Sequence, residues 1–217
     1  MPRLRPVSAA DLEALYAISL ATGDAGGDAS GQYLDGRLVG HIYSAPYAIL
    51  SPETAFVAED DLGVGGYVVG AVDTGAFEER LEREWWPRLR PLYDDPSGTP
   101  WRGWTPDQLR AFMIHHPHRT TGPMVEAFPA HVHMNLLPRM QRRGLGRQLL
   151  NLWLAAAGDL GAVGVHCGVN AANPGGLAFW LAAGFAPFDA AAEVAGRTRW
   201  LVRRLDAPSA GGVAPPR

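Results

Sequence analysis

The chain has no lysine, one cysteine and no long apolar run. All 19 of its basic residues are arginine, and 22 acidic residues bring the formal net charge of the 217 residues to −3. Nucleic-acid-binding proteins usually carry a basic excess, so we expect no nucleic-acid partner. No uninterrupted apolar stretch approaches the ~20 residues that cross a bilayer, and the N-terminal segment is too polar for a signal peptide. We therefore expect a cytoplasmic protein that does not associate with membranes.

The scarcity of cysteine also limits the chemistry. Cys167 cannot form an internal disulfide, and it lies in the apolar segment "AVGVHCGV", which favours a small buried thiol over a nucleophile. The histidines of "HHPHR" (115–119) have no carboxylate or cysteine at ligand spacing, and Pro117 interrupts any helical pairing of ligands. A surface turn is the better interpretation there, and we expect no metal.

Hydrophobic periodicity and turn residues predict strands that alternate with helices, so the fold class is α/β with a mixed sheet. A strand at 3–7 precedes a helix that opens with a capping box at Ser8 and Asp11 and runs to about Leu20, and a glycine-rich loop follows. The two β-rich runs around "EDDLG" in 54–73 are typical of a hairpin. Later strands are predicted at 131–137, 162–169 and 197–205, and later helices at 146–158 and 174–183.

Residues 74–129 differ in character from the rest and predict an elaborated helical connection. A helix in "FEERLEREWWPRLRPLY" ends at its prolines, and a second helix starts near Pro106. The tryptophans of this connection favour a satellite core over a stacking platform, with a pocket wall as the alternative; they are Trp85, Trp86, Trp101 and Trp104. We expect one domain over 1–205 and, from its composition, a disordered tail over 206–217.

The stretch "LPRMQRRGLGRQLL" (137–150) places four arginines and two glycines at the start of a predicted helix. Glycine permits a close approach of the backbone to a ligand, and the free N–H groups of a helix N-terminus favour an anion such as phosphate. The nucleotide-binding P-loop needs a lysine, and the dinucleotide fingerprint needs glycine at Leu149. Both alternatives fail.

Gln141 to Gly146, "QRRGLG", resembles the Q/R-x-x-G-x-G/A signature of the GNAT superfamily of acyl-CoA-dependent N-acetyltransferases. The later segment "NPGGLAFWLAAGF" (173–185) is similar to that family's N-x-x-A-x-x-F-Y-x-x-x-G-F pattern, with Gly176 in place of the alanine and Trp180 in place of the tyrosine. The order and separation of the two motifs match the family.

The N-terminal half resembles one branch of this superfamily. "YAISLATGDAGG", "YAILSPETAFVAEDDLGVGGYVVGAVDT" and "FEERLEREWWPRLRPLY" are similar to the C-terminal acetyltransferase-like domain of O-GlcNAcases. The resemblance spans about 4–205. It implies the GNAT fold, which is a central, mixed and mostly antiparallel sheet flanked by helices, with the elaborated connection before the CoA-binding strand.

The resemblance also implies that acetyl-CoA is the co-substrate and identifies the residues that would hold it. The pyrophosphate would bind the loop Gln141, Arg142, Arg143, Gly144, Leu145, Gly146 and Arg147. The pantetheine arm would bind the main chain of Leu136 and Leu137, and Asn173 would cap its helix and contact the ligand as well. Trp180 stands where many members have a tyrosine that protonates the leaving thiolate. An indole N–H cannot act as that acid, so Trp180 is either a core residue or a sign that the thiolate leaves unaided.

A general base has to accept a proton from the attacking amine, and histidine suits that role near neutral pH. Strand alternation places His131, His133 and Asn135 on one face, although a bulge in the family's strand could change that face. His133 is the first candidate for the base, and a buried, hydrogen-bonded histidine is the competing interpretation for it. Asp24 and Asp28 in the glycine-rich loop are the alternatives, and plain turn chemistry is the competing interpretation for both.

The resemblance therefore predicts an enzyme, an acetyl-CoA-dependent N-acetyltransferase in which an amine attacks directly in a ternary complex. The alternative is a non-catalytic acyl-CoA-binding or protein-interaction module, which the tryptophan at 180 motivates. The sequence does not identify the acceptor amine, and it is compatible with a monomer or a homodimer.

Overall fold

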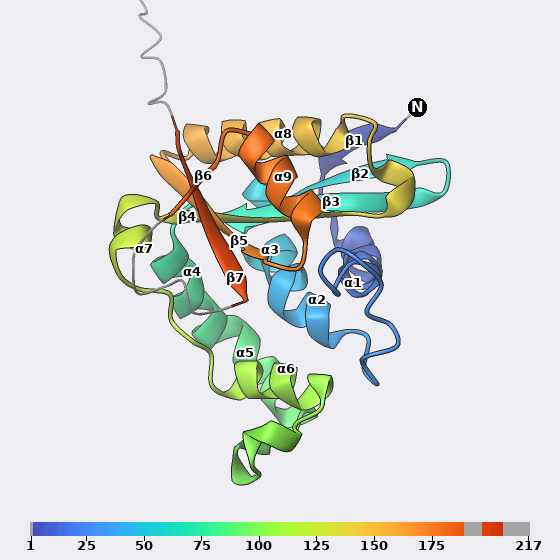
Figure 1. Cartoon of the computed structure of the whole chain (residues 1–217), viewed down its shortest axis with the longest axis vertical. Coiled ribbons are helices and arrows are strands. Elements are labelled where there is room, and N and C mark those ends of the chain that lie inside the picture. The colour runs from blue at the N-terminus through green and yellow to red at the C-terminus, as the bar shows by residue number, and fades with distance from the viewer. Residues whose placement is uncertain (1, 189–196, 206–217) are drawn as a thin grey trace, which may run out of the picture.

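The computed structural model describes residues 2–188 and 197–205 (Figure 1). Its described strands form one seven-stranded sheet in the order β1-β2-β3-β4-β5-β7-β6. Only the β4–β5 pair is parallel, and the other neighbours are antiparallel. This confirms the predicted mixed, mostly antiparallel sheet. The strands are β1 (Arg3–Pro6), β2 (Phe56–Asp60), β3 (Gly63–Ala71), β4 (Ala130–Leu136), β5 (Gly164–Asn170), β6 (Ala186–Pro187) and β7 (Thr198–Arg204).

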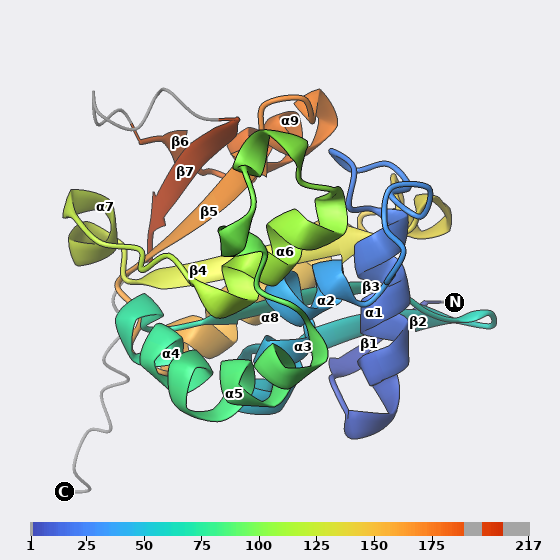
Figure 2. The ribbon, with the colours of Figure 1, turned by 90° about the horizontal axis from the view of Figure 1, so that it is seen from below.

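Helices cover both faces of the sheet. In Figure 1, α8 and α9 lie above the sheet, and α1 to α6 lie below it. Figure 2, seen from below, shows α6 crossing α2, and these two helices pack together. No helix in the described ranges is long and apolar enough to span a bilayer. The helices are α1 (Leu12–Ala21), α2 (Leu38–Tyr43), α3 (Ala45–Leu50), α4 (Thr74–Arg80), α5 (Trp86–Leu89), α6 (Pro106–His115), α7 (Pro123–Ala127), α8 (Leu145–Asp159) and α9 (Pro174–Ala182).

Two hydrophobic clusters fill the two faces. The upper one is built on Trp153 and Leu149 of α8 together with Val132 of β4 and Trp180 of α9. The lower one packs α1, α3 and the α4–α5 segment against β3. Successive strand residues point to opposite faces: β4 contributes Val132 to the upper cluster, and on its other face His131 packs edge-to-face on Tyr47 and Phe77 of the lower cluster.

Most of the predicted elements are confirmed. The hairpin turns at Asp61–Leu62, and the Asp11 carboxylate accepts hydrogen bonds from the backbone N–H and hydroxyl of Ser8, each at 2.8 Å. The pattern assigned nothing to 32–53, which contains α2 and α3. Helices of six residues are not stable alone and form through tertiary packing, so their sequences carry little periodic signal. The tail predicted for 206–217 lies outside the described residues.

The tryptophans of the 74–129 connection do not form a satellite core, so that prediction is wrong. Trp85 and Trp86 are buried in the main lower cluster, where Trp85 Nε1 donates to the carbonyl of His41 at 2.9 Å. Trp101 is 68% exposed, and Trp104 packs on Phe112 of α6. The reason is that the α4–α5 segment packs on α2 and α3 rather than in a separate lobe: Phe77 stacks on Tyr47 of α3, and Trp85 contacts His41 of α2.

Candidate active site

The site begins where β4 and β5 separate. These strands pair only through Ala130 with Val165 and His131 with His166; beyond that point β4 stays paired with β3 and β5 with β7. Figure 2 shows the two strands diverging. Within the described part of the chain, the facing edges beyond this point have backbone N–H and C=O groups that no neighbouring strand uses. An extended ligand can hydrogen-bond there, as an added strand would.

The register shows which backbone groups face the gap. The N–H of Leu137 donates to the carbonyl of Gly65 at 2.8 Å, so it is used within the β3–β4 edge. Alternation along an antiparallel pair then turns the N–H and C=O groups of Leu136 and Met134 toward β5. The N–H of Leu137, which was expected to bind pantetheine, therefore does not face the gap, whereas the N–H groups of Leu136 and Met134 do.

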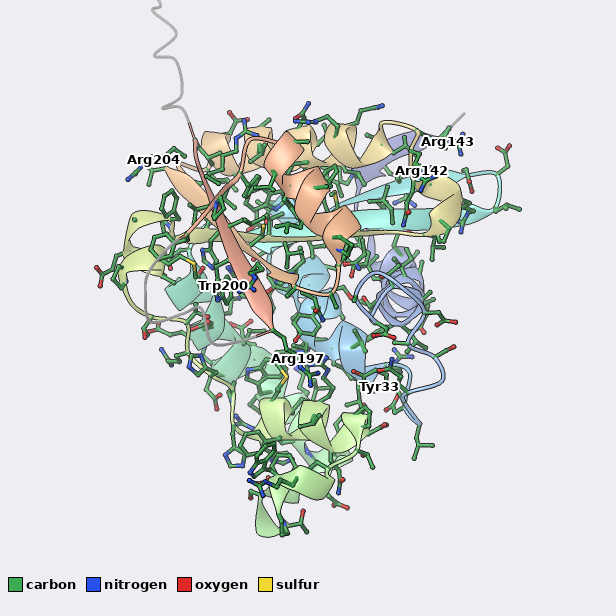
Figure 3. The ribbon with its side chains drawn as sticks, viewed as in Figure 1. Tyr33, Arg142, Arg143, Arg197, Trp200 and Arg204 are labelled. Atoms are coloured by element: carbon green, nitrogen blue, oxygen red, sulfur yellow. The ribbon has the colours of Figure 1, made fainter. Side chains whose placement is uncertain are left out.

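The arginine-glycine loop lies at the end of the gap and leads into α8. Arg142 and Gly144 both take left-handed backbone conformations, with φ of 57° and 76°. A turn that includes left-handed residues points successive backbone N–H groups to the same side. The N–H groups in the first turn of α8 also have no partner within their helix. Arg142 and Arg143 lie together at this end of the molecule (Figure 3). Backbone donors, the helix dipole and guanidinium groups therefore meet where an anion can bind.

A cavity of about 710 Å³, here called the loop-side cavity, occupies the gap beside this loop. It brings together most of the predicted binding residues. Those that line it are Leu136, Gln141, Arg142, Gly144, Gly146, Arg147, Asn173 and Trp180. Sequence reasoning missed the lining residues Met134 and Phe179 and, in the loop after α1, Thr22, Ala25 and Gly26.

Three of the predicted binding residues do not line the loop-side cavity. Leu137 packs against the lower hydrophobic cluster, and Leu145 is buried on the core side of α8. The side chain of Arg143 is exposed and donates to the carbonyl of Arg139 at 3.3 Å. The backbone N–H groups of Leu145 and Arg143 remain part of the loop, so their expected contribution comes from the main chain.

Asn173 and Trp180 hold α9 against the cavity. Asn173 caps the helix, because its Oδ1 accepts from the N–H of Gly176 at 2.7 Å, and its amide also lies beside Gly26. Trp180 is 7% exposed and packs edge-to-face on Phe179 and Phe185 within the upper cluster. Trp180 is therefore both a core residue and part of the cavity wall.

A second cavity of about 590 Å³, here called the helix-side cavity, lies under the sheet and is walled largely by aromatic residues. Trp86 lines it, which fits the pocket-wall alternative for that residue, and Trp200 of β7 (labelled in Figure 3) lines it from the sheet. The two carboxylates on its lining are already engaged. Glu78 accepts from Thr120, and Glu82 forms a bidentate pair with Arg90 at 2.7 and 2.9 Å.

The two cavities share four lining residues at the point of strand separation: Val132, His133, Cys167 and Gly168. Cys167 is 3% exposed, and burial raises the pKa of its thiol, which confirms the interpretation as a buried thiol. A molecule in the loop-side cavity and another in the helix-side cavity can therefore approach each other beside His133.

His133 lies on the predicted face of β4, since the β3–β4 register is regular and the register shift lies in the β2–β3 pairing instead, next to Ala58. Tyr47 of α3 contacts the Nε2 atoms of His131 and His133, at 2.9 and 3.1 Å. Asn135 lies on the same face and donates to Thr22 Oγ1 at 2.7 Å. Burial, aided by the nearby His166, lowers the pKa of His133 to about 4, so the ring is neutral at pH 7.

Asp24 and Asp28 lie in the loop after α1 and line neither cavity. The Asp28 carboxylate accepts from the N–H and hydroxyl of Ser30, both at 2.9 Å, and these bonds lower the pKa of Asp28. Asp24 is exposed, and its backbone forms a bridge with Gly27. The structure does not bring either carboxylate to the gap, and both fit plain turn chemistry.

The histidines of 115–119 reach the helix-side cavity, which the sequence did not suggest. His115 Nε2 donates to the carbonyl of Tyr93 at 2.7 Å, and His116 lies 2.8 Å from Asp95. Among the described residues, no group of three or more His, Cys, Asp or Glu side chains has a metal-binding arrangement.

Comparison with known proteins matches this architecture. No family model matches the chain. Among solved structures, SsHAT is 35% identical and aligns over 94% of this chain and 98% of that one, with a TM-score of 0.86. YncA of Salmonella typhimurium, described as a putative acetyltransferase with its cofactor acetyl-CoA, is 15% identical over 98% of this chain and 99% of its own, with a TM-score of 0.54.

A GNAT superfamily phosphinothricin acetyltransferase from Sinorhizobium meliloti, in complex with acetyl-CoA, is 16% identical over 97% of this chain and 94% of its own, with a TM-score of 0.53. These two distant matches show the shared fold, and the match to SsHAT shows the family. The chain therefore belongs to the GNAT superfamily of acetyltransferases, in the branch that resembles the C-terminal acetyltransferase-like domain of O-GlcNAcase.

Proposed function

We propose that this acetyltransferase binds acetyl-CoA in the loop-side cavity and an amine acceptor in the helix-side cavity, and that the amine attacks directly in a ternary complex. The observation that supports this arrangement is that the two cavities share Val132, His133, Cys167 and Gly168 at the β4–β5 gap. Holding both reactants at one point supplies much of the rate of a two-substrate reaction.

The residues of the loop-side cavity fit the parts of acetyl-CoA. The left-handed turns at Arg142 and Gly144 present backbone donors and guanidinium groups that suit a pyrophosphate. The gap-facing N–H and C=O of Met134 and the N–H of Leu136 suit the amides of a pantetheine arm, which would pair with the strand edge, while the carbonyl of Leu136 accepts from Gln141. When bound, acetyl-CoA supplies the acetyl group as a thioester.

The acceptor would enter among the aromatic side chains of the helix-side cavity. Because Glu78 and Glu82 are already engaged with Thr120 and Arg90, they offer little to hold an ammonium group. The acceptor nitrogen must be neutral to attack. We therefore expect the cavity to bind the neutral form of the amine, and its shape and apolar character to select the rest of the molecule.

His133 is the proposed general base. Its neutral ring can accept a proton once attack on the thioester carbonyl has made the amine nitrogen strongly acidic. A base whose pKa is about 4 is too weak to deprotonate a free alkylammonium efficiently, so it would act during the attack and not before it. Trp180 supplies no acid at the sulfur, and a thiol of pKa ~8.5 is a tolerable leaving group without one.

Two measurements test the proposal. Calorimetry with acetyl-CoA should give saturable binding at sub-millimolar concentration, and its absence would remove the proposed cofactor site. Release of free thiol should then be followed across a panel of amines, peptides and amino sugars. If acetyl-CoA binds and no member of the panel releases thiol, a non-catalytic acyl-CoA-binding module becomes the better account, as the tryptophan at 180 first suggested.

A further inference from the structure

Four side chains and one backbone carbonyl form a chain of hydrogen bonds that ends at His133. Thr74 Oγ1 lies 2.6 Å from the carbonyl oxygen of Pro129 and 2.8 Å from Nδ1 of His131. His131 Nε2 lies 2.9 Å from the hydroxyl of Tyr47, which in turn lies 3.1 Å from Nε2 of His133. Thr74, His131 and Tyr47 are buried, so these groups depend on one another rather than on water for partners.

The carbonyl of Pro129 sets the direction of this chain, because a carbonyl can only accept. The hydroxyl hydrogen of Thr74 therefore points at Pro129, and the Thr74 oxygen must accept from His131. In the reversed direction, two lone pairs would face each other at 2.6 Å between Thr74 and Pro129. The Pro129 carbonyl also accepts from the N–H of Thr74 at 2.8 Å, so the direction is set by the close approach of the two oxygen atoms, which needs a hydrogen between them.

The direction of the Thr74 hydroxyl determines where the protons lie on the other side chains of the hydrogen-bond chain. His131 donates through Nδ1, and since burial beside His133 and His166 keeps its pKa well below the ordinary value, it is neutral and has a lone pair on Nε2. The hydroxyl of Tyr47 must donate to that lone pair, so its oxygen is left to accept from Nε2–H of His133. His133 is neutral as well, and its lone pair then lies on Nδ1.

We propose that Thr74, His131 and Tyr47 are positioning residues that fix His133 as the Nε2–H tautomer, so that Nδ1 is the nitrogen that accepts the substrate proton. The inference rests on the proposed role of His133 in acetyl transfer. His133 carries no second hydrogen-bond partner for its Nδ1 among the described residues, and its side chain lines both cavities. The ring of Tyr43 flanks it on the helix side.

The first test reads the tautomer directly and does not depend on activity. Long-range proton–nitrogen correlation spectra of the histidine-labelled protein, assigned with a His133→Gln variant, should show a protonated Nε2 and a bare Nδ1 for His133. A spectrum with the proton on Nδ1 would overturn the proposal, whether or not the protein transfers acetyl groups. If the tautomer is as expected but no amine is acetylated, the proposed function fails while the hydrogen-bond chain stands.

The second test asks whether the chain matters to turnover. Tyr47→Phe removes the acceptor for Nε2–H and should lower kcat/KM for the amine at least tenfold, with acetyl-CoA affinity unchanged within a few fold. Tyr16→Phe is the matched control, because Tyr16 makes a buried 2.8 Å hydrogen bond to another histidine, His41, and lines neither cavity. Its kcat/KM should stay near that of the wild type.

The far end of the chain separates positioning from general stability. Thr74→Val removes the hydroxyl that orients His131, whereas Thr74→Ser keeps it. We expect the valine variant to show mixed tautomers at His133 and a reduced kcat/KM, and the serine variant to restore both. Equal kinetics and equal tautomer populations in the two variants would contradict a role for Thr74, and a folded-state near-UV spectrum excludes simple unfolding as the cause.

Discussion

The side-chain amide of Gln141 donates to the main-chain carbonyl of Leu136 at 2.8 Å. This bond joins the first residue of the arginine-glycine loop to the end of β4, whose backbone faces the gap. The loop that suits a pyrophosphate and the strand edge that suits a pantetheine arm are therefore held in one fixed relation. A ligand long enough to use both would be bound along a preformed groove.

Gly144→Glu should raise the Kd for acetyl-CoA at least tenfold, because the new carboxylate would lie beside the proposed pyrophosphate position. Gly161→Glu is a close control. Both glycines are exposed and left-handed, with φ of 76° and 86°, but Gly161 does not line the loop-side cavity. Equal losses of affinity in the two variants, measured by calorimetry, would attribute the effect to backbone strain and not to the site.

His133→Gln should lower kcat/KM by roughly 10² to 10⁴, the usual contribution of a positioned base, with little change in acetyl-CoA affinity. Since the pKa of His133 is about 4, its neutral form is complete above pH 6. Any rise of kcat/KM between pH 6 and 9 should then follow the pKa of the acceptor amine, and should move when amines of different pKa are compared. If the rise of kcat/KM stays centred near pH 6.5 for every amine, a group of the protein other than His133 titrates.

Trp180→Phe should leave kcat within about threefold of the wild type, because the indole N–H is not an acid and the ring serves as packing beside Phe179 and Phe185. Trp180→Tyr places a hydroxyl where many family members have one. An increase of kcat in the tyrosine variant alone would show that departure of the thiolate limits turnover. A large loss of kcat in the phenylalanine variant would instead mean that Trp180 has a chemical role.

Acidification should destabilise the fold between pH 6.5 and 4. Burial lowers the pKa of His41 and of His133 to about 4, below the ~6.5 of an unfolded histidine. In that window the unfolded chain binds more protons than the folded one, so the free energy of unfolding falls as the pH falls, by up to about 2 kcal/mol per histidine at pH 5.

Urea titrations at pH 7 and pH 5 measure this effect. The ion pair with Arg5 holds the pKa of Asp11 at about 2. The contribution of this pair to the free energy of unfolding is therefore lost only below pH 4, and it does not affect the comparison of pH 5 with pH 7. Replacing His41 with glutamine should reduce the difference between the two pH values. A wild-type protein equally stable at pH 5 and pH 7 would contradict the burial of neutral histidines.

Features whose causes are local could be predicted from the sequence. The loop at Gln141 to Gly146 and the cap at Asn173 were predictable, because positive φ at glycine, N-cap side chains and first-turn N–H groups act within a few residues of one another. Alternation along a strand likewise placed His131 and His133 on one face. The family resemblance of the two motifs added the GNAT fold, which the structural comparisons then showed.

Which of those groups work together depends on contacts between segments far apart in the sequence. Tyr47 meets His131 and His133 across 84 and 86 residues of sequence, in a helix too short to have a periodic signal of its own. In the register of β3 on β4, the N–H of Leu137 bonds to β3 and the N–H of Leu136 faces the gap. A register shift of one residue would exchange these two orientations. Strand register and helix docking are set by summed long-range packing, so no short segment encodes them, and the proton on His133 depends on a carbonyl that only the folded chain brings within reach of Thr74.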